Sequence, residues 1–276
     1  MVATFHNHTT WSDGQASPDA MAVSAAAAGV EVLGLSDHFC LFPDGSVPGF
    51  SLRPDELSGY LAEIRALQGK GGMEVVAGLE FDWFEQGRSV YEPYAENLPL
   101  DYRIGSVHFV GGKGFDIDAT FWSSKTGEER DAVYAAYWKL VRGMAESRLF
   151  DLAGHLDLPK KFGFYPLSDM RALENEALDA IRAGGLAVEL NTAGYRYPCA
   201  EGYPSLGLLK RCREREIPVT LSSDAHKPEH LLYEFGRGAA LLREAGYTTV
   251  TRFRNREKWS EPLAQALADK AGVGPY

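Results

Sequence analysis

The chain has 276 residues, of which 45% are hydrophobic and 24% are charged, and its net charge is −10. This length fits one large α/β domain, which we expect residues 1–276 to form. The acidic balance argues against DNA or RNA as a partner, because a nucleic-acid footprint needs clustered Lys and Arg. No run approaches the ~20 apolar residues of a membrane-spanning helix, so no membrane partner is expected either.

Short apolar, β-branched runs alternate with helical patterns along the chain. Strands are expected at 2–6, 30–37, 73–82, 102–110, 149–156, 186–191 and 218–223. Helices are expected between them at 18–28, 54–68, 128–147, 168–183 and 205–215, and further helical patterns follow Pro228 and Pro262. Ser17 is a plausible N-cap for the first helix, since Pro18 then takes the first helical position. The glycine-rich stretch 111–114 matches no phosphate-loop spacing and is interpreted as a flexible loop.

The alternation of strands and helices indicates parallel βαβ units. The strands are nearly all apolar, which is typical of strands that are buried on both faces. Seven such units favour a closed or nearly closed α/β barrel. The alternative is an open doubly wound sheet, which should carry a Gly-rich fingerprint after its first strand. Here His6-Asn7-His8 stands at that place instead.

Six of the seven histidines fall at or just beyond the carboxyl end of a predicted strand. They are His6, His8, His38, His108, His155 and His226. In α/β barrels this end is the active-site face. Glu80 ends another strand, and Asp224 lies two residues before His226. Neutral imidazoles and carboxylates that meet on one face form a ligand set for zinc, manganese or iron.

The spacing within these motifs has a physical reason. Side chains at positions i and i+2 of a strand point to the same face. His6 and His8 are therefore placed to bind one ion together, while Asn7 is turned away. The same spacing pairs Asp224 with His226.

With these residues in place, the chain resembles the PHP (polymerase and histidinol phosphatase) family. The matching motifs are "HNHTTWSDG", "GLSDH", "GLEFDW", "GSVHF", "AGHLD" and "SSDAH", which follow one another between residues 6 and 226 in the family's order. The stretches "DYRIGSVHFVGGKGFD", "GHLDLPKKFG" and "VELNTAGYRYP" resemble the histidinol-phosphatase branch in particular.

This resemblance implies an α/β fold of the distorted (β/α)7, TIM-like barrel type with three divalent metal ions. The first ion would be held by His6, His8, Glu80 and Asp224. Glu80 would bridge to a second ion, held also by His108 and His155. The third ion would be held by Asp13, His38 and His226. Glu80, His108 and Asp224 are the ligands to which a catalytic role is assigned.

The implied activity is hydrolysis of a phosphate monoester, L-histidinol phosphate, by a metal-bridging hydroxide that attacks phosphorus. Lys161, Arg196 and Asn191 are expected to contact this small phosphorylated substrate, although Asn191 is equally suited to cap a turn. Candidates for orienting the metal ligands are Asp37 beside His38, Ser223 beside Asp224 and Asp157 near His155.

Two alternatives remain open. The histidinol-phosphatase branch often has a histidine in the first loop, where this chain has Asp13-Gly14. The "SDG" form occurs in other PHP phosphoesterases, which favours a different phosphate ester, such as a nucleotide, a sugar phosphate or a cyclic phosphate. The other alternative is a non-catalytic, metal-binding accessory domain. A chain with three widely spaced cysteines and no basic, apolar leader is expected in the cytoplasm.

Overall fold

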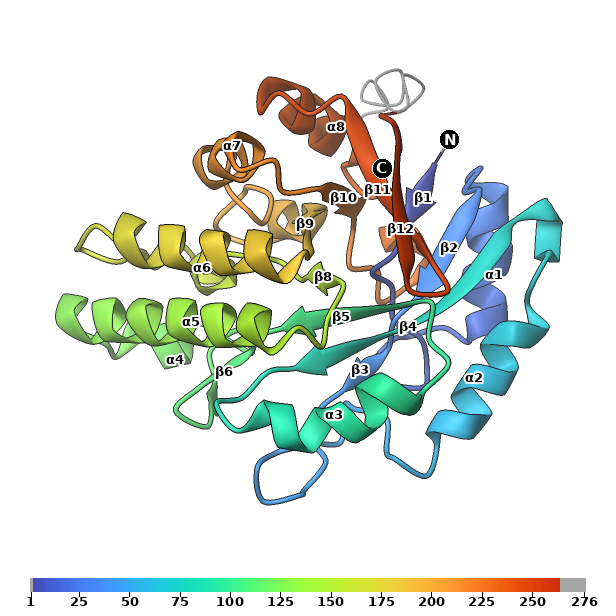
Figure 1. The fold of residues 1–276 in the computed structure, drawn as a ribbon, viewed down its shortest axis with the longest axis horizontal. Coiled ribbons are helices and arrows are strands. Elements are labelled where there is room, and N and C mark those ends of the chain that lie inside the picture. Colours follow the sequence, from blue (N-terminus) through green and yellow to red (C-terminus); the bar gives the residue numbers. More distant parts are fainter. Residues whose placement is uncertain (1, 264–276) are drawn as a thin grey trace.

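Seven parallel strands form a nearly closed barrel in the computed structural model, which describes residues 2–263 (Figure 1). In chain order, which is also their order around the barrel, they are β1 (Ala3–Thr4), β2 (Val32–Leu35), β4 (Glu74–Asp82), β5 (Tyr102–Ser106), β8 (Leu152–Ala153), β9 (Ala187–Asn191) and β10 (Val219–Ser222). Each strand pairs in parallel with the next. A parallel bridge between Asn7 and Ala225 brings the two ends of this order together. The barrel prediction is thereby confirmed, and the open sheet is excluded.

Helices cover the outside of this barrel (Figure 1). They are α1 (Pro18–Ala27), α2 (Leu57–Ala66), α3 (Gly87–Asn97), α4 (Thr120–Ser123), α5 (Gly127–Ser147), α6 (Arg171–Gly184), α7 (Leu206–Glu214) and α8 (Phe235–Glu244). The side chain of Ser17 accepts a hydrogen bond from the Ala20 amide and Pro18 opens α1, as predicted. Helix α3 was missed, since Pro93 lies inside it and interrupts the sequence pattern.

One short 3-10 helix, Lys70–Gly72, follows α2, and three others follow strands, at Leu158–Phe162, Thr192–Arg196 and Pro228–His230. The helical pattern expected after Pro262 lies outside the described residues. Among the described helices, none combines the length and the apolar character needed to cross a membrane. The domain limits 1–276 and the cytoplasmic location stay predictions.

Two antiparallel hairpins were not expected. Strand β6 (Phe109–Val110) pairs with β7 (Lys113–Gly114), and the glycines between them have φ of 57° and 74°. Two consecutive residues with positive φ form the tight turn of a two-residue hairpin, so the prediction of a flexible loop was wrong. A second hairpin joins β11 (Thr249–Arg254) to β12 (Glu257–Pro262).

This second hairpin covers the amino end of the barrel. The Phe253 ring lies 5.3 Å from the Phe5 ring and 5.9 Å from the Tyr102 ring, measured between centroids. The amides of Asn255 and Arg256 donate to Asp101, just before β5. An apolar plug therefore closes the amino end, which leaves the carboxyl end as the open face.

Candidate metal centre

The carboxyl ends of the strands bring all nine predicted ligands into one cluster. These residues are His6, His8, Asp13, His38, Glu80, His108, His155, Asp224 and His226. Strand β3 (His38–Phe39) continues the path of β2 and pairs with β4, which places His38 directly opposite Glu80. Glu80 and the histidines other than His226 are buried.

Glu80 lies at the centre of the cluster. One of its carboxylate oxygens, Oε2, lies 3.2 Å from His6 Nε2 and 2.9 Å from His38 Nδ1. The other, Oε1, lies 2.9 Å from His155 Nε2 and 3.7 Å from His108 Nε2. A carboxylate whose two oxygens face separate groups of imidazoles has the geometry of a bridging metal ligand.

His6, His8 and Asp224 form one group of donor atoms beside Glu80. Asp224 Oδ1 lies 3.2 Å from His8 Nε2 and 3.8 Å from His6 Nε2. Both rings come from the extension of β1 and face the same side, as the i, i+2 spacing predicts.

A second group lies where His108 and His155 meet. Their Nε2 atoms are 3.0 Å apart, and both face Glu80 Oε1. Two imidazole nitrogens and a carboxylate oxygen that converge in this way match the donor set for a divalent metal.

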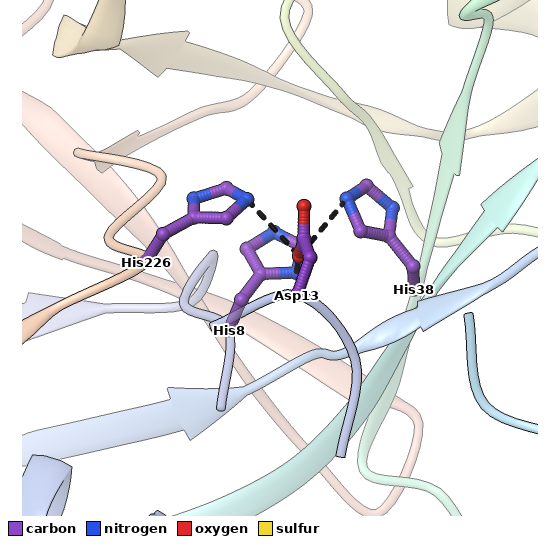
Figure 2. A group of neighbouring side chains, drawn as sticks. All are labelled: His8, Asp13, His38 and His226. Atoms are coloured by element: carbon purple, nitrogen blue, oxygen red, sulfur yellow. Dashed lines mark ion pairs between the residues drawn. The ribbon is translucent and has the colours of Figure 1, made fainter. Parts of the chain in front are cut away.

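The third group surrounds Asp13 (Figure 2). Asp13 Oδ1 lies 3.3 Å from His226 Nε2, 3.7 Å from His38 Nε2 and 3.9 Å from His8 Nδ1. The aspartate is placed among three imidazoles, of which His38 and His226 belong to the predicted third ligand set. His8 thus faces this group through Nδ1 and the first group through Nε2.

The hydrogen bonding of the cluster leaves donor atoms that are suited to bind cations. Within the described residues, several buried donor atoms have no hydrogen-bond partner; they are His6 Nε2, His8 Nδ1, His8 Nε2, His38 Nδ1, Glu80 Oε2 and Asp224 Oδ1. Leaving such atoms unpaired costs free energy, about 1–3 kcal/mol each. Divalent cations bound among these atoms would satisfy them.

The pKa values in the metal-free cluster also indicate that its carboxylates are negatively charged. Burial alone would raise the pKa of Glu80, but the surrounding histidines, His6 first, hold it well below its usual range. Burial alone would lower the pKa of His38, but Glu80 and Asp13 raise it to about 9. The carboxylates therefore stay ionised and attract positive charge, whether from protons or from metal ions.

Two buried carboxylates stand behind the histidines. Glu189 Oε2 lies 2.8 Å from His6 Nδ1, and Asp82 Oδ1 lies 2.6 Å from His108 Nδ1. A carboxylate on the far ring nitrogen fixes the orientation of a metal-binding histidine. The sequence analysis did not assign this role to either residue. A signal for Asp82 was present, because it lies two residues from Glu80 on the same strand.

Within the described residues, none of the three side chains predicted to orient ligands forms a hydrogen bond with a predicted ligand. The Asp37 carboxylate accepts hydrogen bonds from the Thr9 amide and the Ser12 hydroxyl, so it fixes the loop that carries Asp13 and does not bond to His38. The Asp157 carboxylate accepts from Lys160 and from the Ser205 amide. Among the described residues, the buried Ser223 hydroxyl has no hydrogen-bond partner.

A pocket of about 530 Å³ opens beside the cluster and is lined by Lys161 and Arg196, two of the predicted substrate contacts. The Arg196 guanidinium donates to the carbonyl oxygens of Ser223 and Asp224, and no described carboxylate neutralises it. Lys161 Nζ donates to the backbone oxygen of Asp116, at 2.7 Å, and to its carboxylate. The pocket thus has two cationic side chains beside the metal-ligand groups.

Asn191, the third predicted substrate contact, does not lie at the pocket with Lys161 and Arg196. Its side chain is fully buried, donates to Glu189 and Asp224, and accepts from the Ala193 amide. It lies behind the ligands and does not line the pocket. This corrects the prediction. The residue ends β9, where an Asn side chain readily bonds to the backbone two residues further on.

The sequence and fold match known proteins. A PHP-domain model matches residues 4–193. A probable histidinol-phosphatase of Deinococcus radiodurans is 38% identical over 87% of this chain and 91% of its own length. The histidinol-phosphatase of Lactococcus lactis is 27% identical over 90% of this chain and 92% of its own length.

Among solved structures, histidinol phosphate phosphatase from Lactococcus lactis, in complex with zinc, L-histidinol and phosphate, superposes with a TM-score of 0.78. The match has 23% identity and covers 94% of this chain and 98% of that one. A putative histidinol phosphatase from Listeria monocytogenes gives a TM-score of 0.69 at 18% identity, over 83% of this chain and 96% of that one. The shared barrel, together with the family match over residues 4–193, shows that the chain belongs to the PHP-domain family.

Proposed function

We propose that this chain hydrolyses L-histidinol phosphate to L-histidinol and phosphate, using divalent metal ions at the carboxyl end of its barrel. The observation that carries the proposal is the convergence of histidine and carboxylate donor atoms at the carboxyl end of the barrel, beside a pocket with two cationic side chains. The curated relatives, which are named as histidinol-phosphatases and match most of the chain, support the substrate.

The residues divide into three metal sites that share ligands. His6, His8, Glu80 and Asp224 hold the first ion. Glu80, His108 and His155 hold the second. Asp13, His38 and His226 hold the third. Several residues also face a neighbouring site in this division: His8 Nδ1 lies 3.9 Å from Asp13, and His38 Nδ1 lies 2.9 Å from Glu80.

The donor chemistry indicates which metals fit. Imidazole nitrogens and carboxylate oxygens suit zinc, manganese and iron, and none of the donor groups within residues 2–263 includes a cysteine. Bound ions of this kind supply Lewis acidity that stabilises phosphoryl charge and activates water.

The chain's own residues position the ester. Arg196 presents a guanidinium whose charge no described carboxylate neutralises, and guanidinium groups bind phosphate oxygens in a bidentate manner. Lys161 adds a second positive charge at the pocket. Glu189 and Asp82 hold the rings of His6 and His108 in the orientation that their metal-facing nitrogens require.

The test is turnover by metal-loaded protein of L-histidinol phosphate and of a panel of nucleotide and sugar monophosphates. The proposal expects the highest kcat/KM for L-histidinol phosphate. A higher kcat/KM for another ester, by orders of magnitude, would reject this substrate and favour the second candidate function, a PHP phosphoesterase with a different substrate. Asp13 in the first loop is the observation that favours this second candidate. Metal binding without hydrolysis of any ester would instead identify an accessory domain.

A further inference from the structure

Asp116 is a pocket residue that the sequence analysis gave no role. It follows the β6–β7 hairpin, next to the fully buried Phe115. The Phe115 amide donates to the His108 carbonyl oxygen at 3.1 Å, and the Trp122 indole donates to the Phe115 carbonyl oxygen at 2.6 Å. The backbone beside Asp116 is therefore attached both to a predicted metal ligand and to the protein core.

Its carboxylate differs from the others in the pocket. Three described carboxylates line the pocket, those of Asp13, Asp116 and Asp224. Asp13 and Asp224 belong to the metal-ligand groups, whereas Asp116 does not. Asp116 is instead the partner of Lys161, whose Nζ lies 3.2 Å from Asp116 Oδ2. Asp116 is thus the pocket carboxylate that remains available to the organic part of a substrate.

An apolar surface lines the same pocket. Phe50, Phe109 and Ile117 contribute to it, and the Phe50 and Phe109 rings lie nearly parallel with centroids 6.5 Å apart. Ile117 is 71% exposed although it is a large apolar residue next to Asp116. A pocket with cations, one carboxylate outside the metal-ligand groups and aromatic rings suits a ligand that combines an anion, a cation and a flat ring.

L-Histidinol phosphate has these three parts. Its phosphate group is esterified to the carbon next to the one that bears the ammonium, and its imidazole lies on the other side of that carbon. A phosphate near Lys161 therefore places the ammonium a few bonds away, where a carboxylate beside Lys161 is a suitable partner. Each charge of the substrate then faces an opposite charge of the pocket: the phosphate faces Lys161, and the ammonium faces Asp116. Such complementary charges favour specific binding.

We propose that the Asp116 carboxylate binds the ammonium of the substrate's alcohol, and so makes the pocket selective for phosphate esters of amino alcohols. This inference rests on the proposed function, because it concerns the part of the substrate that leaves. Asp116, next to the β6–β7 hairpin, would then select the substrate by its alcohol. The metal-ligand groups would not do so, since the bound ions face the phosphoryl group.

The experiment compares L-histidinol phosphate with the same ester lacking the amine, 3-(imidazol-4-yl)propyl phosphate. We expect the metal-loaded wild-type protein to prefer the amine-bearing ester in kcat/KM by about 10–100-fold, as for a hydrogen bond to a charged group. D116N should reduce this preference to about threefold or less. The matched control is D118N, which removes the same charge from an exposed position two residues away and outside the pocket; it should keep the wild-type preference.

The outcomes separate the inference from the function. If D116N lowers kcat/KM for both esters by the same factor, Asp116 serves only to position Lys161 and the inference is wrong. If D116N folds poorly, as judged by its melting temperature, D116E takes its place and should keep a preference of tenfold or more; a complete loss of preference in D116E would also overturn the inference. If wild-type protein does not hydrolyse L-histidinol phosphate, the proposed function itself fails.

Discussion

The two ends of the barrel are built from the same strands but from opposite chemistry. At the amino end, Phe5, Tyr102 and Phe253 pack edge to face or tilted, with ring centroids 5.3–5.9 Å apart. At the carboxyl end, one residue after Phe5, the chain places His6 beside Glu80 and Glu189. The change from apolar packing to buried charge takes place between two consecutive residues, directly after β1.

This difference separates stability from function. Burial of aromatic rings at the amino end contributes favourable free energy, whereas buried carboxylates and imidazoles without metal cost it. Changes at the amino end should therefore lower stability and spare metal binding. Changes at the carboxyl end should lower metal binding and activity while affecting the metal-free fold less.

The largest effect is expected for E80Q, because Glu80 lies within 4 Å of five histidine side chains. We expect kcat/KM to fall by more than about 100-fold, beyond the usual loss for a residue that only supports a ligand. Elemental analysis should show fewer bound ions per chain. Wild-type turnover in E80Q would contradict the bridging position of this residue.

F253A tests the opposite end. Removal of this buried ring should lower the free energy of unfolding by about 3–5 kcal/mol. Metal content per folded chain should stay at the wild-type value, because the ring packs in the apolar cluster with Phe5 and Tyr102. Chemical denaturation gives the first quantity and elemental analysis the second. Loss of metal from folded F253A would show that the two ends are coupled.

E189Q should have an intermediate effect on metal binding. The Glu189 carboxylate lies against His6 Nδ1 and also accepts from the His155 amide, so it orients two ligands. We expect a 10–100-fold lower metal affinity, measured by competition with a chelator. The matched control is E201Q, which changes a half-exposed carboxylate paired with Lys160 and should leave the affinity unchanged. Equal metal affinities of the wild-type protein, E189Q and E201Q would show that Glu189 does not orient the metal ligands.

The smallest effect concerns pH. In the metal-free protein, Glu80 and Asp13 raise the pKa of His38 to about 9 against the lowering effect of burial, and Asp82 and Glu80 raise that of His108 to about 10. Since these folded-state pKa values exceed the unfolded value of about 6.5, the stability they contribute is present below pH 6.5 and is lost as the pH rises through 9 to 10.

Metal-free protein should therefore show a falling melting temperature between pH 6.5 and 10. Metal-loaded protein should not show this trend, because its ligand histidines are deprotonated throughout. Thermal scans of both forms in matched buffers test this difference. A melting temperature of the metal-free form that rises over this interval would contradict the charge pattern of the cluster.

The barrel and the convergence of the nine residues on one face were predictable because each rests on a local pattern. Alternating apolar runs mark the strands, and a histidine at the end of a strand identifies its face without knowledge of its neighbours. The partners of those residues were not predictable in the same way. Glu189 bonds to His6 across 183 residues of sequence, and Asp116 meets Lys161 across 45, so both pairs depend on how the barrel closes.

The position of Asn191 shows the same limit. Its place at the end of β9 left a substrate contact and a turn cap equally open, and the side chain accepts from the Ala193 amide and donates to Glu189. The apolar plug was missed because β11 and β12 follow the last predicted strand, where no βαβ unit was expected. Local patterns thus indicate which residues reach the open face, while tertiary packing decides what each of them contacts.

The central claim is that the carboxyl end of this barrel holds metal ions that the phosphatase activity requires. The most direct measurement is a metal titration of chelator-stripped protein, with bound ions per chain and turnover of L-histidinol phosphate recorded at each step. The account predicts no turnover in the stripped protein and full recovery as about three ions bind per chain. Full turnover by stripped protein in the presence of chelator would contradict it.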